Sequence, residues 1–143
     1  MAAPVSSSRS IEIEALPEVV WSVLTGIGDW PQWNPEVKSM SFDGRLEPGS
    51  TFRWKAGPGT IVSTLEEVDP PRHVRWRGKT MSIAALHEYR LTPRDGGTCV
   101  ETEETFSGLL ARLMRGSLQR TLDSSLEQGL EHLKVESERR AAG

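Results

Sequence analysis

Residues 109–133 read LLARLMRGSLQRTLDSSLEQGLEHL, with leucines that recur every three or four positions. That spacing places the leucines on one face of an α-helix, whereas Arg112, Gln119 and Glu127 fall on the opposite, solvent-facing side. The pattern predicts one long amphipathic helix that starts after Gly108 and continues towards the end of the chain. Its apolar positions are Leu109, Leu110, Leu113, Met114, Leu118, Leu122, Leu126, Leu130 and Leu133.

Before this helix, residues 37–107 alternate short β-prone runs with turn compositions such as Asp43-Gly44, Pro48-Gly49 and Asp95-Gly96-Gly97. Short runs separated by tight turns are typical of neighbouring antiparallel strands. We expect six strands in this region, at Val37–Asp43, Ser50–Lys55, Thr60–Val68, His73–Lys79, Ser82–Thr92 and Thr98–Phe106.

The N-terminal part of the chain predicts one more strand and two short helices. Residues 9–15 alternate around two isoleucines, as a half-buried strand does. Pro17 then suits the first turn of a helix, which the glycines near Gly28 end. A second short helical turn is expected around Pro31.

Together these elements predict a single α+β domain over residues 9–139, in which a curved seven-stranded antiparallel sheet wraps the long helix. We expect residues 1–8 to form a disordered N-terminal tail and residues 140–143 a C-terminal tail. A homodimer that buries the leucine face in a coiled coil is the alternative. A sheet with nothing else to cover it favours the intramolecular arrangement.

The charge balance narrows the range of partners. Seventeen Lys and Arg residues stand against twenty Asp and Glu, a net charge of -3. No overall basic field therefore attracts nucleic acid or anionic lipid, and either partner would require a local basic patch. Arg75, Arg77 and Lys79 lie on a strand whose alternation turns them to solvent, so we expect no nucleic-acid partner.

The sequence lacks the motifs of common metal and enzyme sites. Cys99 is the only cysteine, and no Cys/His run has zinc-ligand spacing. Walker loops, Gly-x-Ser-x-Gly and His-Glu-x-x-His are absent, and no apolar run approaches the ~18 residues of a membrane span. We expect a cytoplasmic protein with no metal, no cofactor and no segment inserted in a membrane.

Six short motifs occur in an order that resembles a known family. They are Trp30-Pro31-Gln32-Trp33-Asn34-Pro35, Glu67-Val68-Asp69-Pro70-Pro71-Arg72, His87-Glu88-Tyr89-Arg90-Leu91-Thr92-Pro93, Gly96-Gly97-Thr98, Glu104-Thr105-Phe106-Ser107-Gly108-Leu109-Leu110 and Leu130-Glu131-His132-Leu133-Lys134. From about Ile11 to Glu138 the chain resembles the polyketide cyclase/dehydrase group of the START-like, or SRPBCC, superfamily. The resemblance implies a helix-grip fold with a deep apolar cavity between sheet and long helix. The superfamily includes lipid carriers, hormone receptors and aromatase/cyclases, so the fold alone does not decide the function.

Alternation along the strands predicts which residues line such a cavity. We expect the turn before Thr98 to pair that residue with Leu91. This register puts His87 opposite Thr102 and diagonal to Glu104, so that a histidine and a carboxylate meet inside an apolar chamber. The predicted lining is Trp30, Trp33, Phe52, Trp54, Trp76, Ile83, His87, Tyr89, Val100, Thr102, Glu104, Phe106, Leu110, Met114, Leu118 and Leu122.

Three interpretations of His87 and Glu104 stay open, and no catalytic residue is assigned. The two side chains satisfy each other as buried polar groups, they bind the polar group of a ligand, or His87 acts as a general base. We favour binding of a small hydrophobic molecule, such as a polyketide, lipid or aromatic metabolite. A polyketide aromatase/cyclase is the first alternative, and a co-chaperone-like interaction module is the second. Trp30 and Trp33 lie in a Pro-bearing loop and are candidates for a lid.

Overall fold

The computed structural model describes residues 3–42, 44–57 and 59–143. Its strands are β1 (Val5–Ile13), β2 (Ser39–Ser41), β3 (Thr51–Lys55), β4 (Thr60–Asp69), β5 (His73–Thr80), β6 (Ile83–Arg94) and β7 (Gly97–Ser107). Its helices are α1 (Pro17–Thr25), the 3-10 turn η1 (Ile27–Asp29), α2 (Trp30–Trp33), α3 (Leu109–Leu113) and α4 (Arg115–Ala142). The predicted order of strand, short helices, strands and C-terminal helix is confirmed.

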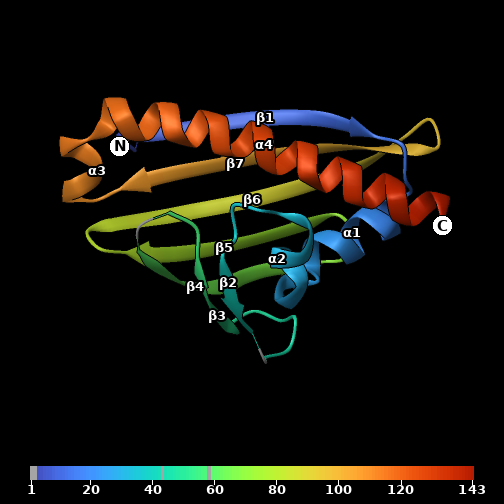
Figure 1. Cartoon of the computed structure of the whole chain (residues 1–143), viewed down its shortest axis with the longest axis horizontal. Coiled ribbons are helices and arrows are strands. Elements are labelled where there is room, and N and C mark those ends of the chain that lie inside the picture. The colour runs from blue at the N-terminus through green and yellow to red at the C-terminus, as the bar shows by residue number, and fades with distance from the viewer. Residues whose placement is uncertain (1–2, 43, 58) are drawn as a thin grey trace.

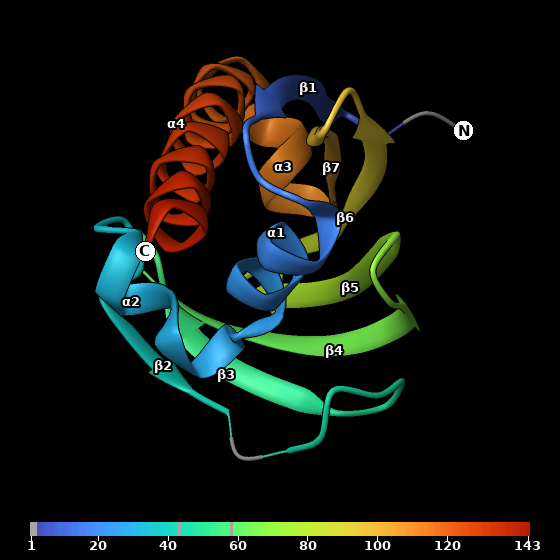
Figure 2. The same ribbon diagram turned by 90° about the vertical axis from the view of Figure 1, so that its right-hand side faces the viewer.

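The strands form one seven-stranded sheet in the order β1-β7-β6-β5-β4-β3-β2. Each neighbouring pair is antiparallel. The sheet curves strongly, and α4 lies along its open side next to β1 (Figures 1 and 2). This is the helix-grip fold, in which a curved sheet holds a long helix against its concave face.

The leucine face of α4 covers the sheet, as predicted. Its four central leucines are each at most 3% exposed, and α1 contributes further buried side chains to the same core. Burial of each leucine contributes roughly 1.5–3 kcal/mol, which holds the helix in place. The face that a coiled-coil dimer would need is therefore already buried within the chain. These leucines are Leu122, Leu126, Leu130 and Leu133.

β1 begins four residues earlier than predicted. Val5 is fully buried against two leucines of α4, and this loss of apolar area from water stabilises the start of the strand. The disordered tail expected over residues 1–8 is therefore wrong for residues 5–8. Residues 1–2 lie outside the described part of the chain.

The C-terminal helical segment is broken at Met114, where the backbone leaves the helical region with φ -113 and ψ 24. The prediction of one continuous helix from residue 109 is therefore wrong, because α3 is separate. Gly108 joins β7 to α3 with φ +104, where a Cβ would collide with the carbonyl oxygen of Ser82. The tail expected over residues 140–143 is also wrong, since α4 continues to Ala142.

Of the other strands, β2 differs from the prediction and β5 agrees with it. β2 covers only part of the predicted Val37–Asp43, because Val37 packs into the core after α2. Asp43 lies outside the described residues. On β5 the predicted alternation is confirmed: Trp76 is buried, whereas Arg75 and Arg77 form ion pairs with Glu66 on the outer face.

Within the described residues, no helix has the length and apolar character needed to cross a membrane.

Candidate ligand-binding cavity

A cavity of about 450 Å³ lies between the concave face of the sheet and α4. Side chains from β3, β4, β5, β6 and β7 form one wall, α4 forms the other, and α2 contributes to one end. The lining is largely apolar. It includes Trp30, Trp33, Trp54, Ile61, Trp76, Ile83, Tyr89, Phe106, Leu110, Met114, Leu118, Leu122, Leu126 and Leu133.

Trp30 is the centre of the aromatic part of this wall. Its ring centroid lies 5.4 Å from those of Trp54 and Trp76, and Phe52 meets it edge-on at 5.6 Å. These separations favour attraction between aromatic rings. Trp30 Nε1 also donates to a backbone carbonyl of α1 at 2.9 Å. Trp30 is therefore fixed in the core, the packing role rather than the lid role for which it was a candidate, whereas Trp33 is half-buried at the cavity edge.

The β6–β7 turn is tighter than predicted. Asp95 and Gly96 both have positive φ, at 50 and 80, and form a two-residue turn. Leu91 consequently pairs with Val100, two residues beyond the expected Thr98. The predicted register is wrong, but a shift of two residues leaves each side chain on its original face.

His87 and Glu104 face each other directly in the observed register. His87 Nδ1 lies 3.4 Å from Glu104 Oε1, and both side chains line the cavity. They are 10% and 17% exposed. The histidine and the carboxyl group thus meet on the inner face, although by a different pairing from the one predicted.

Hydrogen bonds to Thr102 assign the proton on His87. Thr102 Oγ1 donates its single proton to the carbonyl oxygen of Glu88 at 2.9 Å. The same Oγ1 lies 2.9 Å from His87 Nε2 and therefore accepts the proton of that nitrogen. In a neutral imidazole, Nδ1 is then an acceptor that faces Glu104. At 3.4 Å this contact is longer than an ordinary hydrogen bond, so the acid can also turn to a ligand.

Burial favours the uncharged form of both groups. It raises the pKa of Glu104 to about 8 and lowers the pKa of His87 to about 3, because the apolar wall solvates neither charge. Burial also raises the pKa of the Tyr89 hydroxyl, and the nearby Glu104 adds to this effect. Near neutral pH the pair is therefore a carboxylic acid beside a neutral imidazole, not an ion pair.

Glu36 is a second carboxyl group on the cavity wall that the sequence did not reveal. It follows α2, where its backbone N–H donates to Asn34 Oδ1 at 3.0 Å. Partial burial raises the pKa of its carboxyl group, and His132 opposes this shift. No periodic pattern marks this loop, so the direction of the Glu36 side chain could not be predicted. Among the described residues no group of three or more His, Cys, Asp or Glu is placed to hold a metal ion.

Gly129 is a further lining residue that the sequence analysis missed. It lies within α4, and a Cβ built on it would meet nothing within 4 Å. A glycine inside a helix costs about 1 kcal/mol relative to alanine, so the missing side chain leaves room in the cavity at the expense of helix stability. An isolated glycine in an otherwise regular helical pattern was the available signal.

Three predicted lining residues lie outside the cavity wall. Phe52 and Val100 belong to the core, at 1% and 0% exposure. Thr102 is the hydrogen-bond partner of His87 and supports it from the side. The other predicted residues line the cavity.

A family model described as polyketide cyclase / dehydrase and lipid transport matches residues 4–138. The chain belongs to this family. The match includes the whole sheet and most of α4, so the resemblance inferred from the sequence motifs is confirmed. No curated protein sequence matches the chain.

Solved structures similar to this polyketide cyclase/dehydrase family member have the same fold. The aromatase/cyclase Zhui from Streptomyces sp. R1128 is 19% identical with a TM-score of 0.80, over 96% of this chain and 97% of Zhui. The di-domain aromatase/cyclase StfQ from the steffimycin biosynthetic pathway is 16% identical with a TM-score of 0.82. That match covers 97% of this chain and 52% of StfQ, so the chain spans about half of its length. A START superfamily protein from Mycobacterium smegmatis is 16% identical with a TM-score of 0.69, over 96% of this chain and 97% of that protein.

Proposed function

We propose that this family member binds one small, largely apolar molecule, such as a polyketide, a lipid or an aromatic metabolite, in the cavity between the sheet and α4. The observation that carries the proposal is a cavity of about 450 Å³ whose apolar wall contains the facing pair His87 and Glu104. In sites of this kind the apolar wall supplies affinity and a few polar groups fix the orientation of the ligand.

The polar pair suits an uncharged polar group on the ligand. The protonated Glu104 can donate to a ketone or hydroxyl oxygen, and His87 Nδ1 can accept from a hydroxyl. A ligand carboxylate would instead meet the carboxyl groups of Glu104 and Glu36, with the exposed Lys79 as the cation in the lining. We therefore expect phenols and ketones to bind more tightly than acids of the same shape.

Titration with the neutral, polarity-sensitive dye Nile red tests this proposal. We expect saturable binding of one dye per chain, with quenching of tryptophan emission by energy transfer from the aromatic wall. Naphthol should displace the dye at concentrations roughly tenfold below those of naphthoate, because the acid must bury a charge. A folded protein that shows no saturable dye binding would contradict the proposal.

Polyketide aromatase/cyclase activity is a second candidate, favoured by the placement of an acid beside a free imidazole nitrogen. Two of the similar structures are aromatase/cyclases. In an aldol closure, His87 Nδ1 would take a proton from a methylene between two ketones, and Glu104 would protonate the carbonyl under attack. A carbon–carbon bond and a hydroxyl form, and loss of water then gives the aromatic ring. The low pKa of His87 makes it a weak base, which is why we place binding first.

A linear poly-β-ketone thioester separates the two candidates. A cyclase should convert it with multiple turnovers, and Glu104→Gln should abolish turnover while Nile red still binds. Binding of the thioester to the wild type without turnover would rule out the cyclase function and leave the binding function.

A further inference from the structure

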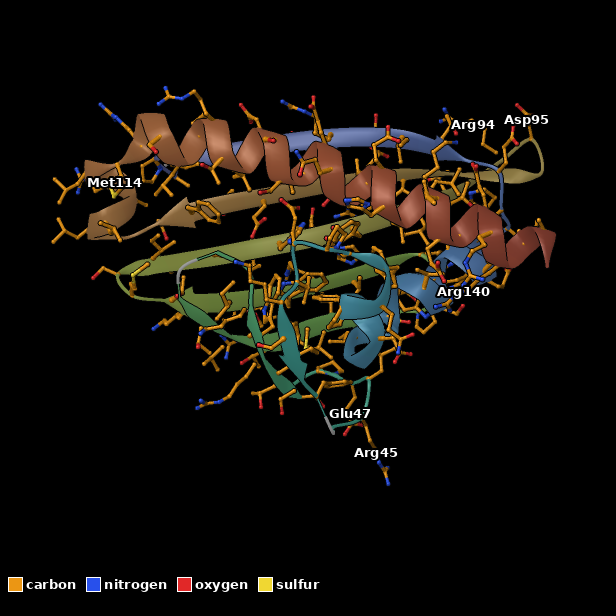
Figure 3. The ribbon with its side chains drawn as sticks, in the orientation of Figure 1. Arg45, Glu47, Arg94, Asp95, Met114 and Arg140 are labelled. Carbon is orange, nitrogen blue, oxygen red and sulfur yellow. The ribbon has the colours of Figure 1, made fainter. Side chains whose placement is uncertain are left out.

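One end of the molecule exposes large apolar side chains around an opening of the cavity. Leu109, Leu113 and Met114 are 67%, 73% and 45% exposed, and Met81 is 66% exposed. The first three lie in α3 and at the break before α4, and Met81 lies in the β5–β6 turn at the same end of the molecule (Figures 1 and 3). Met81 and Met114 both line the cavity, so this exposed group borders its mouth.

The same end is basic. Residues 107–122 contain Arg112, Arg115 and Arg120 but no Asp or Glu. All three arginines are exposed, and within the described part of the chain none of them forms an ion pair, whereas Arg9, Arg75, Arg77 and Arg94 each do. Lys79 adds a fourth exposed cation on the cavity rim. A chain with a net charge of -3 therefore has the local basic patch that an anionic partner requires.

We propose that this end docks onto the surface of an anionic lipid bilayer, with the cavity mouth facing the lipid. We call it the mouth surface, and it consists of Met81, Leu109, Arg112, Leu113, Met114, Arg115 and Arg120.

Two properties of the mouth surface favour lipid as the partner. Apolar side chains flanked by arginines match an interface in which hydrocarbon lies just below anionic headgroups. Leu109 and Leu113 stand exposed, so a deformable interface can surround them, whereas a rigid protein partner would need a matching pocket. Docking in this orientation would let an apolar ligand pass between bilayer and cavity without crossing water. The proposal rests on the proposed binding function and adds the place where the ligand enters and leaves the cavity.

Sedimentation with vesicles tests the proposal on the full chain. The protein should bind vesicles of equal parts phosphatidylcholine and phosphatidylglycerol, and added salt or pure phosphatidylcholine vesicles should weaken binding strongly. Arg112→Gln should weaken binding about fivefold, and Arg45→Gln, far from the mouth, should leave it unchanged. Leu113→Ser should weaken binding about tenfold. Val135→Ser, at a position 65% exposed on α4, is the matched control for Leu113→Ser.

The following results of the vesicle experiments would overturn the proposal. Absence of vesicle binding, equal binding to both vesicle types, or equal effects of Leu113→Ser and Val135→Ser would each do so. Salt-sensitive binding of polyglutamate through Arg112 without vesicle binding would assign the mouth surface to an acidic protein instead. Nile red binding by the same protein variants without vesicles reports on the cavity separately, so loss of docking and loss of ligand binding are distinguishable.

Discussion

His87 lies directly opposite Glu104 in the β6–β7 ladder, with His87 Nδ1 3.4 Å from Glu104 Oε1 on the cavity wall. Thr102 fixes the proton on the other ring nitrogen, and burial keeps the acid protonated. An ion pair at this place would carry a desolvation cost of several kcal/mol per charge. Two neutral groups avoid that cost and still offer a donor and an acceptor to a ligand.

Glu104→Gln should remove a pH dependence of stability. The pKa of Glu104 is about 8 in the folded chain against an ordinary value of 4.5, so the wild type loses stability as the pH rises through this range. His87, with a pKa lowered from 6.5 to about 3, acts in the opposite sense and mainly below pH 6.5. Between pH 6.5 and pH 8 Glu104 is therefore the larger contributor of the two, and the His87 contribution, which both proteins share, cancels in the comparison.

Over that interval the free energy of unfolding of the wild type should fall by about 1–2 kcal/mol relative to Glu104→Gln. Urea unfolding of both proteins at the two ends of the interval measures the difference. A constant difference between the two proteins would mean that Glu104 is already ionised at the lower pH.

Thr102→Val should destabilise the fold by about 1–3 kcal/mol, because it leaves the buried His87 Nε2–H without its acceptor. Thr121→Val, at an exposed position of α4, should change the free energy of unfolding by less than about 0.5 kcal/mol. Nitrogen-15 NMR of the wild type should find a neutral ring protonated on Nε2. An imidazolium signal for His87 at neutral pH would refute the proton assignment.

Much of this fold could be predicted from the sequence, because helical and strand periodicity report which face of each element is buried. The leucine spacing of α4 and the alternation on β5 both predict the correct buried faces. The break at Met114 could not be predicted, since the apolar spacing continues through it. The early start of β1 was also missed, because Ser6-Ser7-Ser8 has the composition of a disordered tail and is ordered by two tertiary contacts, the pairing with β7 and the burial of Val5 against α4.

The candidate site was predictable only in part. Strand alternation places His87 and Glu104 on the inner face in any register that is shifted by an even number of residues. The two side chains therefore still lie on the same face although the predicted turn is wrong. Their protonation states depend on Thr102 and on the depth of burial, which no spacing reveals. Glu36 lies in a loop, where side-chain direction follows from tertiary packing.

Leu133→Ala should cost about 2–4 kcal/mol, because this side chain is 1% exposed at the contact between α4 and the sheet. Val135→Ala removes apolar atoms from a side chain that is 65% exposed and should stay within about 0.5 kcal/mol. Urea unfolding of both variants measures the difference. Similar losses in the two variants would show that α4 is not held by its leucine face.

Substitution of Gly129 tests most directly whether the cavity holds the ligand. Gly129→Ala should raise the free energy of unfolding by about 0.5–1 kcal/mol through helix propensity and should keep Nile red affinity, because a methyl group takes little of the open space. Gly129→Phe should place a ring inside the cavity and abolish dye binding in a folded chain. Gly116→Phe, at an α4 glycine that does not line the cavity, should bind Nile red as the wild type does. Wild-type Nile red affinity in a folded Gly129→Phe variant would contradict the account, because the ligand would then lie elsewhere.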